Sequence, residues 1–238
     1  MKKVIFCVLS IALLSCVFTY SQTNDKVWNQ ISGSWSVETA TKMLFDSKSK
    51  SIAYGYSELI NTNSIISIPV MTKASRFETE IELFSPSDSS SGTFIFTSQS
   101  YKSYYAVQLQ GSKKGIEKAV LQQCAVKDTT LPPSAKNNFT ITELASKPVS
   151  LKWGNPVKIT ITAKKKKLKA DINGTEIDFT LDSALPEGSV GFSHTNNLMK
   201  IRSIKVLSDN TVIFEDDFSQ DRIKKMVYKA EKVDKASK

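Results

Sequence analysis

The chain has 238 residues, of which 40% are hydrophobic and 23% are charged, and its 32 Lys and Arg against 23 Asp and Glu give a formal net charge of +9. Two of its three cysteines lie before residue 17, which excludes a disulfide framework, and after the N-terminal segment no apolar run reaches the about 20 residues that span a membrane. The length suits one large domain, and the basic charge favours acidic glycans or other acidic partners.

The N-terminus has the layout of a bacterial secretion signal. Two lysines precede an apolar run that ends at Phe18, and small residues before Gln22 offer a cleavage site. This predicts a signal peptide over residues 1–21 and a chain exported to the periplasm or the cell exterior, where nucleic acid is not an expected partner. Alternatively, the Leu-Leu-Ser-Cys sequence that ends at Cys16 resembles a lipoprotein box, in which Cys16 would be acylated.

The first clear strand is expected over residues 77–83, where apolar and acidic residues alternate. One face carries Glu78, Glu80 and Glu82, spaced about 7 Å apart along the strand. In retaining glycoside hydrolases two carboxylates flank the scissile bond about 5 to 5.5 Å apart, so this face is a candidate for catalysis. A solvated strand face is the preferred interpretation, because the aromatic neighbours of a sugar site are missing.

A hairpin is expected from the alternating runs 93–97 and 104–110, after a Ser-rich loop over 85–92. Three tyrosines cluster at its turn, and they are the first candidates for ligand binding: Tyr101, Tyr104 and Tyr105. A tyrosine ring can stack on a sugar while its hydroxyl donates a hydrogen bond, but it can equally fill a core with its polar tip in water.

From Gly111 to Lys152 the alternation weakens, with one short apolar strand expected over 119–121 and two prolines near residue 132. We therefore expect a long insertion here, of the kind in which binding specificity often resides. Trp153, directly after this region, is a further candidate for ligand contact.

Three alternating runs over residues 157–181 predict antiparallel strands, the last two joined by an Asn173-Gly174 turn. Between the first two runs stands a possible anion-binding group of four lysines: Lys164, Lys165, Lys166 and Lys167. The simpler interpretation is a hairpin tip whose like charges discourage edge-to-edge aggregation. The alternative, contact with an anionic polymer, would be weakened by added salt.

No metal or catalytic site is predicted. His194 is the only histidine and cannot by itself form a zinc site or a catalytic triad, so a loop position near a strand end is the preferred interpretation, with ligand contact the alternative. Asp171, Asp178 and Asp182 could hold calcium only if neighbouring carbonyl oxygens joined them, because calcium takes six to eight oxygen ligands. We expect no cofactor.

The C-terminal part begins with an apolar-acidic segment over 212–218, expected as a closing strand beside the N-terminal one. From Asp221 onward apolar residues recur at steps of three and four among lysines, which predicts a short basic amphipathic helix over 221–238. It would dock on the sandwich or contact a partner or an anionic surface.

Several segments together resemble the concanavalin A-like jelly roll, more narrowly laminin-G-like modules and the keto-disaccharide hydrolase type of domain. They include VWNQISGSWSV from residue 27, SGTFIF from residue 91, WGNPVKITI from residue 153, EGSVGF from residue 187 and MKIRSIKV from residue 199. The resemblance implies ligands on the concave sheet or on the loops beside it. The Glu-x-Asp-x-Glu motif of the glycosidases and the metal-ligand spacing of the lectins are both missing.

The sequence thus predicts an all-β fold, a two-sheet antiparallel β-sandwich over residues 22–220 with a short C-terminal helix. The first functional hypothesis is a secreted, non-catalytic binding module for a carbohydrate or a cell-envelope polymer. A structural or assembly protein of the bacterial envelope, acting through protein-protein contacts, is the alternative, and a glycoside hydrolase is third.

Overall fold

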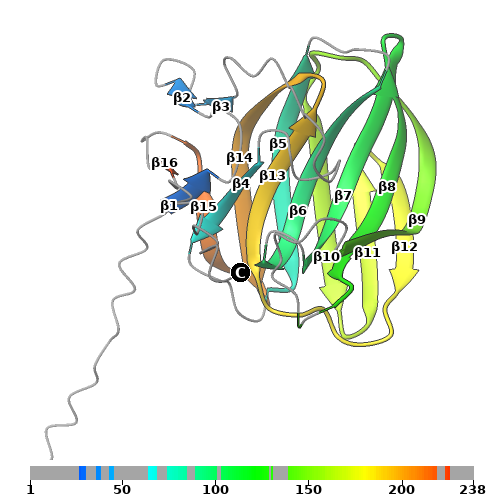
Figure 1. Cartoon of the computed structure of the whole chain (residues 1–238), viewed down its shortest axis with the longest axis vertical. Coiled ribbons are helices and arrows are strands. Elements are labelled where there is room, and N and C mark those ends of the chain that lie inside the picture. The colour runs from blue at the N-terminus through cyan, green and yellow to red at the C-terminus, as the bar shows by residue number, and fades with distance from the viewer. Residues whose placement is uncertain are drawn as a thin grey trace, which may run out of the picture.

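The structure is a computed structural model that describes residues 27–30, 36–38, 43–45, 64–68, 74–84, 89–100, 103–128, 130, 139–218 and 223–225. These ranges contain sixteen β-strands and no helix, and the strands form two sheets that face each other (Figure 1). The predicted all-β sandwich is confirmed. Within the same ranges, no helix is long and apolar enough to cross a membrane.

Sheet A contains eight strands in the order β16-β1-β4-β13-β6-β7-β8-β9. Its strands pair antiparallel except β1 and β16, which run parallel with Trp28 opposite Ile223. In spatial order the bounds are Ile223–Lys225 (β16), Val27–Gln30 (β1), Ser64–Ile68 (β4), Ser189–Thr195 (β13), Ser90–Ser100 (β6), Ser103–Ser112 (β7), Gly115–Val126 (β8) and Phe139–Leu151 (β9).

Sheet B has the order β12-β11-β10-β5-β14-β3-β2, and β15 also pairs with β14. The predicted Asn173-Gly174 turn joins β11 and β12, and both of its residues have positive φ angles, 49° and 88°, which these residue types tolerate. In spatial order the bounds are Thr175–Thr180 (β12), Lys167–Ile172 (β11), Val157–Lys164 (β10), Arg76–Phe84 (β5), Leu198–Ser208 (β14), Met43–Phe45 (β3), Ser36–Glu38 (β2) and, paired with β14, Thr211–Asp216 (β15).

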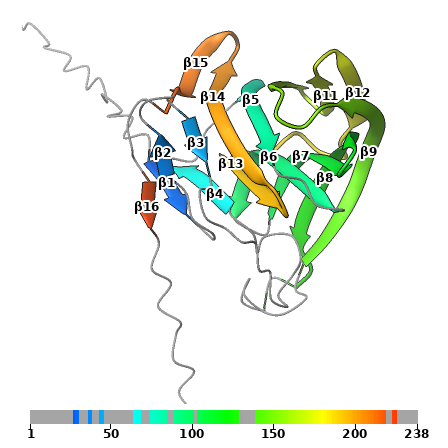
Figure 2. The same cartoon turned by 90° about the horizontal axis from the view of Figure 1, so that it is seen from above.

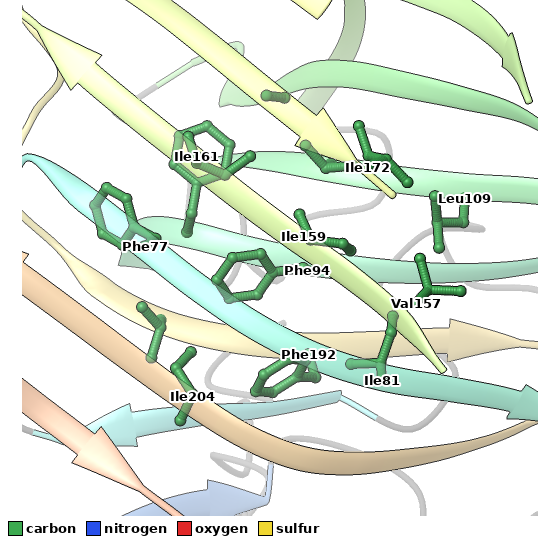
Figure 3. Close-up of a cluster of buried hydrophobic side chains, with 14 of the residues drawn as sticks. Phe77, Ile81, Phe94, Leu109, Val157, Ile159, Ile161, Ile172, Phe192 and Ile204 are labelled. Atoms are coloured by element: carbon green, nitrogen blue, oxygen red, sulfur yellow. The ribbon is translucent and has the colours of Figure 1, made fainter. Parts of the chain in front are cut away.

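The hydrophobic core lies between the two sheets, which Figure 2 shows from above. Strand β10 shows how a sheet supplies this core. Its residues Val157, Ile159 and Ile161 are buried and the residues between them are more exposed, because successive side chains of a strand point to opposite faces. They face aromatic side chains of sheet A such as Phe94 and Phe192, whose rings stack 5.3 Å apart (Figure 3).

The region expected to be a long insertion instead contributes two of the longest strands, β8 with 12 residues and β9 with 13. The alternation is weak because β8 is apolar on both faces: Ala119 and Leu121 pack in the core, while Val120 and Cys124 are buried on the opposite face. Strand β9 lies at the edge of sheet A and is largely exposed or half-buried. These strands are therefore recognised by their pairing with neighbouring strands, β7 with β8 and β8 with β9, and not by an alternation of apolar and polar residues.

The two ends of the described chain meet at one side of the sandwich. Trp28 is 1% exposed, and its Nε1 donates a 2.8 Å hydrogen bond to Asp216 Oδ2, while Asp216 Oδ1 accepts from the Phe218 backbone nitrogen at 2.8 Å. The segment 211–216 pairs with β14, and it is β16 that lies beside β1. Within the predicted C-terminal helix, residues 223–225 are therefore a strand, since β1 offers them a sheet edge; the rest of 221–238 lies outside the described residues.

Candidate ligand-binding pocket

The crossing loop, residues 181–188, leads from β12 at the edge of sheet B to β13 in the middle of sheet A. It is fixed at both sheets. The Leu181 nitrogen donates to the Lys166 carbonyl at 2.7 Å on the side of sheet B, and Thr97 Oγ1 donates to the Pro186 carbonyl at 2.9 Å on the side of sheet A. The loop therefore covers one end of the sandwich, where β7 begins and β8 ends.

A pocket of about 230 Å³ opens between this loop and sheet A, and we call it the tyrosine pocket. Among the residues that the structure describes, its lining holds no charged side chain. Around it stand Thr97 and Gln99 of β6, Ser103, Tyr104 and Tyr105 of β7, Gln123 and Cys124 of β8, and Ser183, Ala184 and Pro186 of the crossing loop.

A second hollow of about 210 Å³ adjoins the tyrosine pocket and shares Thr97 and Pro186 with it. It is lined mainly by Phe77, Leu185 and Glu187. Gly188, at its edge, has no room for a side chain, because a Cβ atom would lie 2.6 Å from the Ser98 backbone nitrogen. The glycine thus lets the crossing loop approach β6 closely enough to form both hollows.

Tyr105 is the predicted candidate whose position fits a ligand. It is half-buried, its ring packs against Phe96 at 6.5 Å, and it lines the tyrosine pocket. Burial raises the pKa of its phenol, the nearby Asp182 carboxylate raises it further, and a hydrogen bond with the Gln123 side chain lowers it. The phenol is thus protonated at neutral pH and can both donate and accept hydrogen bonds.

Tyr104, the preceding residue, points to the opposite face of sheet A. It is 4% exposed and packs with Ile95, Ala106 and Cys124. Burial raises the pKa of its phenol well above the usual range, and the neighbouring Cys124, which is hydrogen-bonded to it, adds to the rise. Tyr104 is among the lining residues of the pocket, but its buried ring offers little surface to a ligand.

Two of the other predicted ligand residues, Trp153 and His194, lie elsewhere. Tyr101 is outside the described residues. Trp153 is half-buried at the opposite end of β7, where its Nε1 donates to the Ser112 carbonyl at 2.7 Å. His194 is inside β13 rather than in a loop and is fully buried, because its register opposite Gly92 turns it toward the core, so a ligand at the surface could not touch it.

The four lysines 164–167 form the tip of the β10-β11 hairpin, as predicted, and all are exposed. Lys165 adopts a φ of 55° in the two-residue turn, and Lys166 Nζ donates to the Asp182 carbonyl at 2.5 Å. Asp182 is directly followed by Ser183 and Ala184, which line the tyrosine pocket. The structure thus brings the lysine tip and Tyr105, which are 60 positions apart in sequence, to the same end of the sandwich.

Sequence reasoning missed the amides and the hydroxyls of the pocket, such as Gln99, Gln123 and Ser183. Gln123 belongs to β8, which the sequence did not reveal as a long strand. Ser183 lies in a loop whose course depends on where both sheets are placed. Polar residues of these types occur at many surface positions, so no sequence signal distinguished them.

The three glutamates on β5 are held by arginines. Arg202 on β14 lies 3.4 Å from Glu80 and also binds Glu82, and Arg76 Nε binds Glu78 at 2.6 Å. They project from the face of sheet B that is turned away from the core, because the residues that alternate with them, such as Phe77, Ile81 and Leu83, are buried in the core. A guanidinium thus occupies the space between two carboxylates where a glycosidic bond would have to lie.

Across the ranges that the structure describes, no group of three His, Cys, Asp or Glu side chains is arranged to hold a metal ion. Asp171 instead accepts a 2.8 Å hydrogen bond from the Gly174 nitrogen in the β11-β12 turn. Asp178 lies opposite Lys169 in the same hairpin, and Asp182 is in the crossing loop.

No family model and no curated protein matches the chain. Among solved structures it is similar to the carbohydrate binding module CBM66 from Bacillus subtilis, with 13% identity and a TM-score of 0.55 over 81% of this chain and 97% of that one. Weaker likenesses include a Bacillus licheniformis beta-glucanase (11% identity, TM-score 0.47, 76% and 92% covered) and CG-16, a homodimeric agglutinin from chicken liver (8%, 0.43, 60% and 99%). The fold is a concanavalin A-like jelly roll.

Proposed function

We propose that this protein is a non-catalytic carbohydrate-binding module that holds a sugar in the tyrosine pocket. The observation that carries the proposal is the chemistry of the lining: one half-buried tyrosine ring among neutral amides and hydroxyls, namely Gln99, Ser103, Gln123 and Ser183. A sugar ring presents C–H groups to an aromatic face and hydroxyls at its edge, and each amide or hydroxyl of the pocket can donate to or accept from those hydroxyls.

The size of the pocket favours a single sugar residue. Its volume of about 230 Å³ is below the roughly 300 to 1,000 Å³ of sites that enclose drug-sized ligands. A polysaccharide would therefore insert one ring, at a chain end or on a side branch, and leave its remaining rings outside the pocket.

The placement of the carboxylates supports binding without cleavage. The described lining of the tyrosine pocket has no Asp or Glu, whereas hydrolysis of a glycoside requires a pair of them. The candidate glutamates Glu80 and Glu82 lie on the outer face of sheet B with Arg202 between them. The likeness to the carbohydrate-binding module from Bacillus subtilis, at 13% identity, is one of fold alone. The proposal therefore depends on the pocket and not on that likeness.

Affinity electrophoresis of the chain from Gln22 onward, through gels that contain neutral and acidic polysaccharides, tests this function. We expect at least one polysaccharide to retard the protein, and Tyr105→Ala to abolish the retardation. Tyr105→Phe is the matched variant: it keeps the ring and loses the hydroxyl, so it should retain part of the affinity. Assays for released reducing sugar run in parallel. Failure of every polysaccharide to retard the protein would refute the proposal, and release of sugar would refute its non-catalytic part.

Export through a signal peptide over residues 1–21 belongs to the same proposal, because the polysaccharides concerned lie outside the cytoplasm. Mass spectrometry of the mature protein distinguishes the two predicted routes. A chain that begins at Gln22 indicates plain secretion, and a chain that begins at a lipid-modified Cys16 indicates a lipoprotein.

A further inference from the structure

The rim of the tyrosine pocket is charged, although the described residues of its lining are neutral. The crossing loop and the lysine tip are joined by two hydrogen bonds, from the Leu181 nitrogen to the Lys166 carbonyl and from Lys166 Nζ to the Asp182 carbonyl. Ser183 and Ala184, the next residues of the loop, line the tyrosine pocket. The lysine tip is thus attached to the wall of the pocket, and its position relative to Tyr105 is fixed by these contacts.

The balance of charge on this rim is positive. Lys164 to Lys167 provide four exposed ammonium groups, and the adjoining stretch 181–186 contains a single acidic residue, Asp182. Glu187 lines the second hollow and not the tyrosine pocket. Four neighbouring like charges repel one another, and this repulsion is relieved when an anion binds among them.

We propose that the sugar held in the tyrosine pocket is acidic, with a carboxylate or a sulfate group that Lys165 and Lys166 bind at the rim. This inference rests on the proposed carbohydrate-binding function and names the class of its ligand. Lysine suits the role, because its compact charge on a flexible four-carbon stem can follow an anionic group without a fixed geometry. The chain from Gln22 onward keeps 30 of the 32 Lys and Arg against 23 Asp and Glu, and this net charge of +7 also draws a polyanion toward the protein from a distance.

The chain offers a matched control at the opposite end of the sandwich. Lys113 and Lys114 form the exposed two-residue turn between β7 and β8. The test therefore compares Lys165→Asn/Lys166→Gln with Lys113→Asn/Lys114→Gln, and each of these variants removes two charges from an exposed two-residue hairpin turn. Asparagine at position 165 tolerates the positive φ angle found there.

Both variants are run in gels with polygalacturonate, alginate or chondroitin sulfate, and in gels with the same polymers after carboxyl reduction or desulfation. Neutral glucans and galactans complete the panel, and thermal unfolding verifies that each variant is folded.

We expect an acidic polymer to retard the wild-type protein more than the carboxyl-reduced or desulfated form of the same polymer does. The tip variant should bind it about tenfold more weakly, equal to about 1.4 kcal/mol, while the opposite-end variant binds as the wild type does. Salt at about 0.5 M should reduce the difference between the two variants.

Three results would overturn the inference. Retention by neutral polymers alone would refute the acidic ligand and leave the proposed function standing. Equal losses in both lysine variants would indicate general attraction to net charge and not a site. Retention by no polymer would refute the proposed function itself, and the inference with it.

Discussion

The hydrogen bonds of Asp216 give the sharpest prediction of stability. Its two carboxylate oxygens accept from Trp28 Nε1 and from the Phe218 nitrogen, both at 2.8 Å, and Asp216 is 7% exposed. The Trp28 and Phe218 rings also pack 5.4 Å apart. The substitution Asp216→Ala removes both acceptors and leaves two buried N–H donors without a partner.

The expected cost follows from those two donors. Each buried donor without a partner costs about 1 to 3 kcal/mol, and removing the buried charge returns part of that sum, so we expect a loss of about 3 kcal/mol. This is a large share of the about 5 to 15 kcal/mol that stabilises a typical domain. For a domain of this size, the midpoint of thermal unfolding should fall by about 6 to 12 °C.

Thermal and urea unfolding of wild type, Asp216→Ala and Glu215→Ala measures the effect. Glu215 is the preceding residue of β15 and is exposed, so its removal should change the free energy of unfolding by less than about 0.5 kcal/mol. In a double-mutant cycle with Trp28→Phe, the two losses should add up to more than the loss in the double mutant, because both single changes break the same hydrogen bond. A loss at Asp216 no larger than that at Glu215 would refute the reasoning.

Three further predictions concern other parts of the sandwich. Burial holds the pKa of Tyr104 above its unfolded value of about 10. The contribution of the protonated phenol to stability is therefore complete below pH 10 and is lost as the pH rises further. In unfolding curves measured at alkaline pH, the stability of Tyr104→Phe should fall less steeply with pH than that of the wild type. Gly188→Ala should lower both the melting temperature and glycan affinity, since the new Cβ would meet the Ser98 nitrogen at 2.6 Å, and unchanged affinity would contradict the role of the close approach. Glu82→Gln should cost about 1 kcal/mol through its ion pair with Arg202 and leave glycan binding unchanged, which gel retardation can verify.

The fold was predictable where one face of a strand is apolar and the other polar. In β10 and β11 the alternation is complete, and the Asn173-Gly174 turn determines the register that joins β11 to β12. Strands β8 and β9 were not predictable in this way, because their residues do not separate into an apolar and a polar face. The segment at 223–225 shows the converse: its helical spacing was visible, but the open edge of β1 offers backbone hydrogen bonds to a strand.

The candidate site was predictable only in parts. Tyr105 and the lysine tip were each recognisable from residue type and from the turns beside them. Their position at the same end of the sandwich was not predictable, because it depends on the course of the crossing loop. This loop contacts Lys166 of sheet B and Thr97 of sheet A. His194 illustrates the opposite error: a single histidine near a strand end resembles a surface residue until the register opposite Gly92 turns it inward.

The parallel pairing of β1 with β16 has a mechanical consequence. Trp28, Asn29 and Gln30 lie opposite Ile223, Lys224 and Lys225, so the two strands point the same way along the edge of sheet A. A pulling force applied to the chain before Val27 and after Lys225 would act along this pair and load its hydrogen bonds together in shear, instead of opening them one after another. Trp28, which belongs to this pair, is buried and donates its indole hydrogen bond to Asp216. Such a force would thus first load this edge of sheet A, whereas the tyrosine pocket is lined by β6, β7, β8 and the crossing loop.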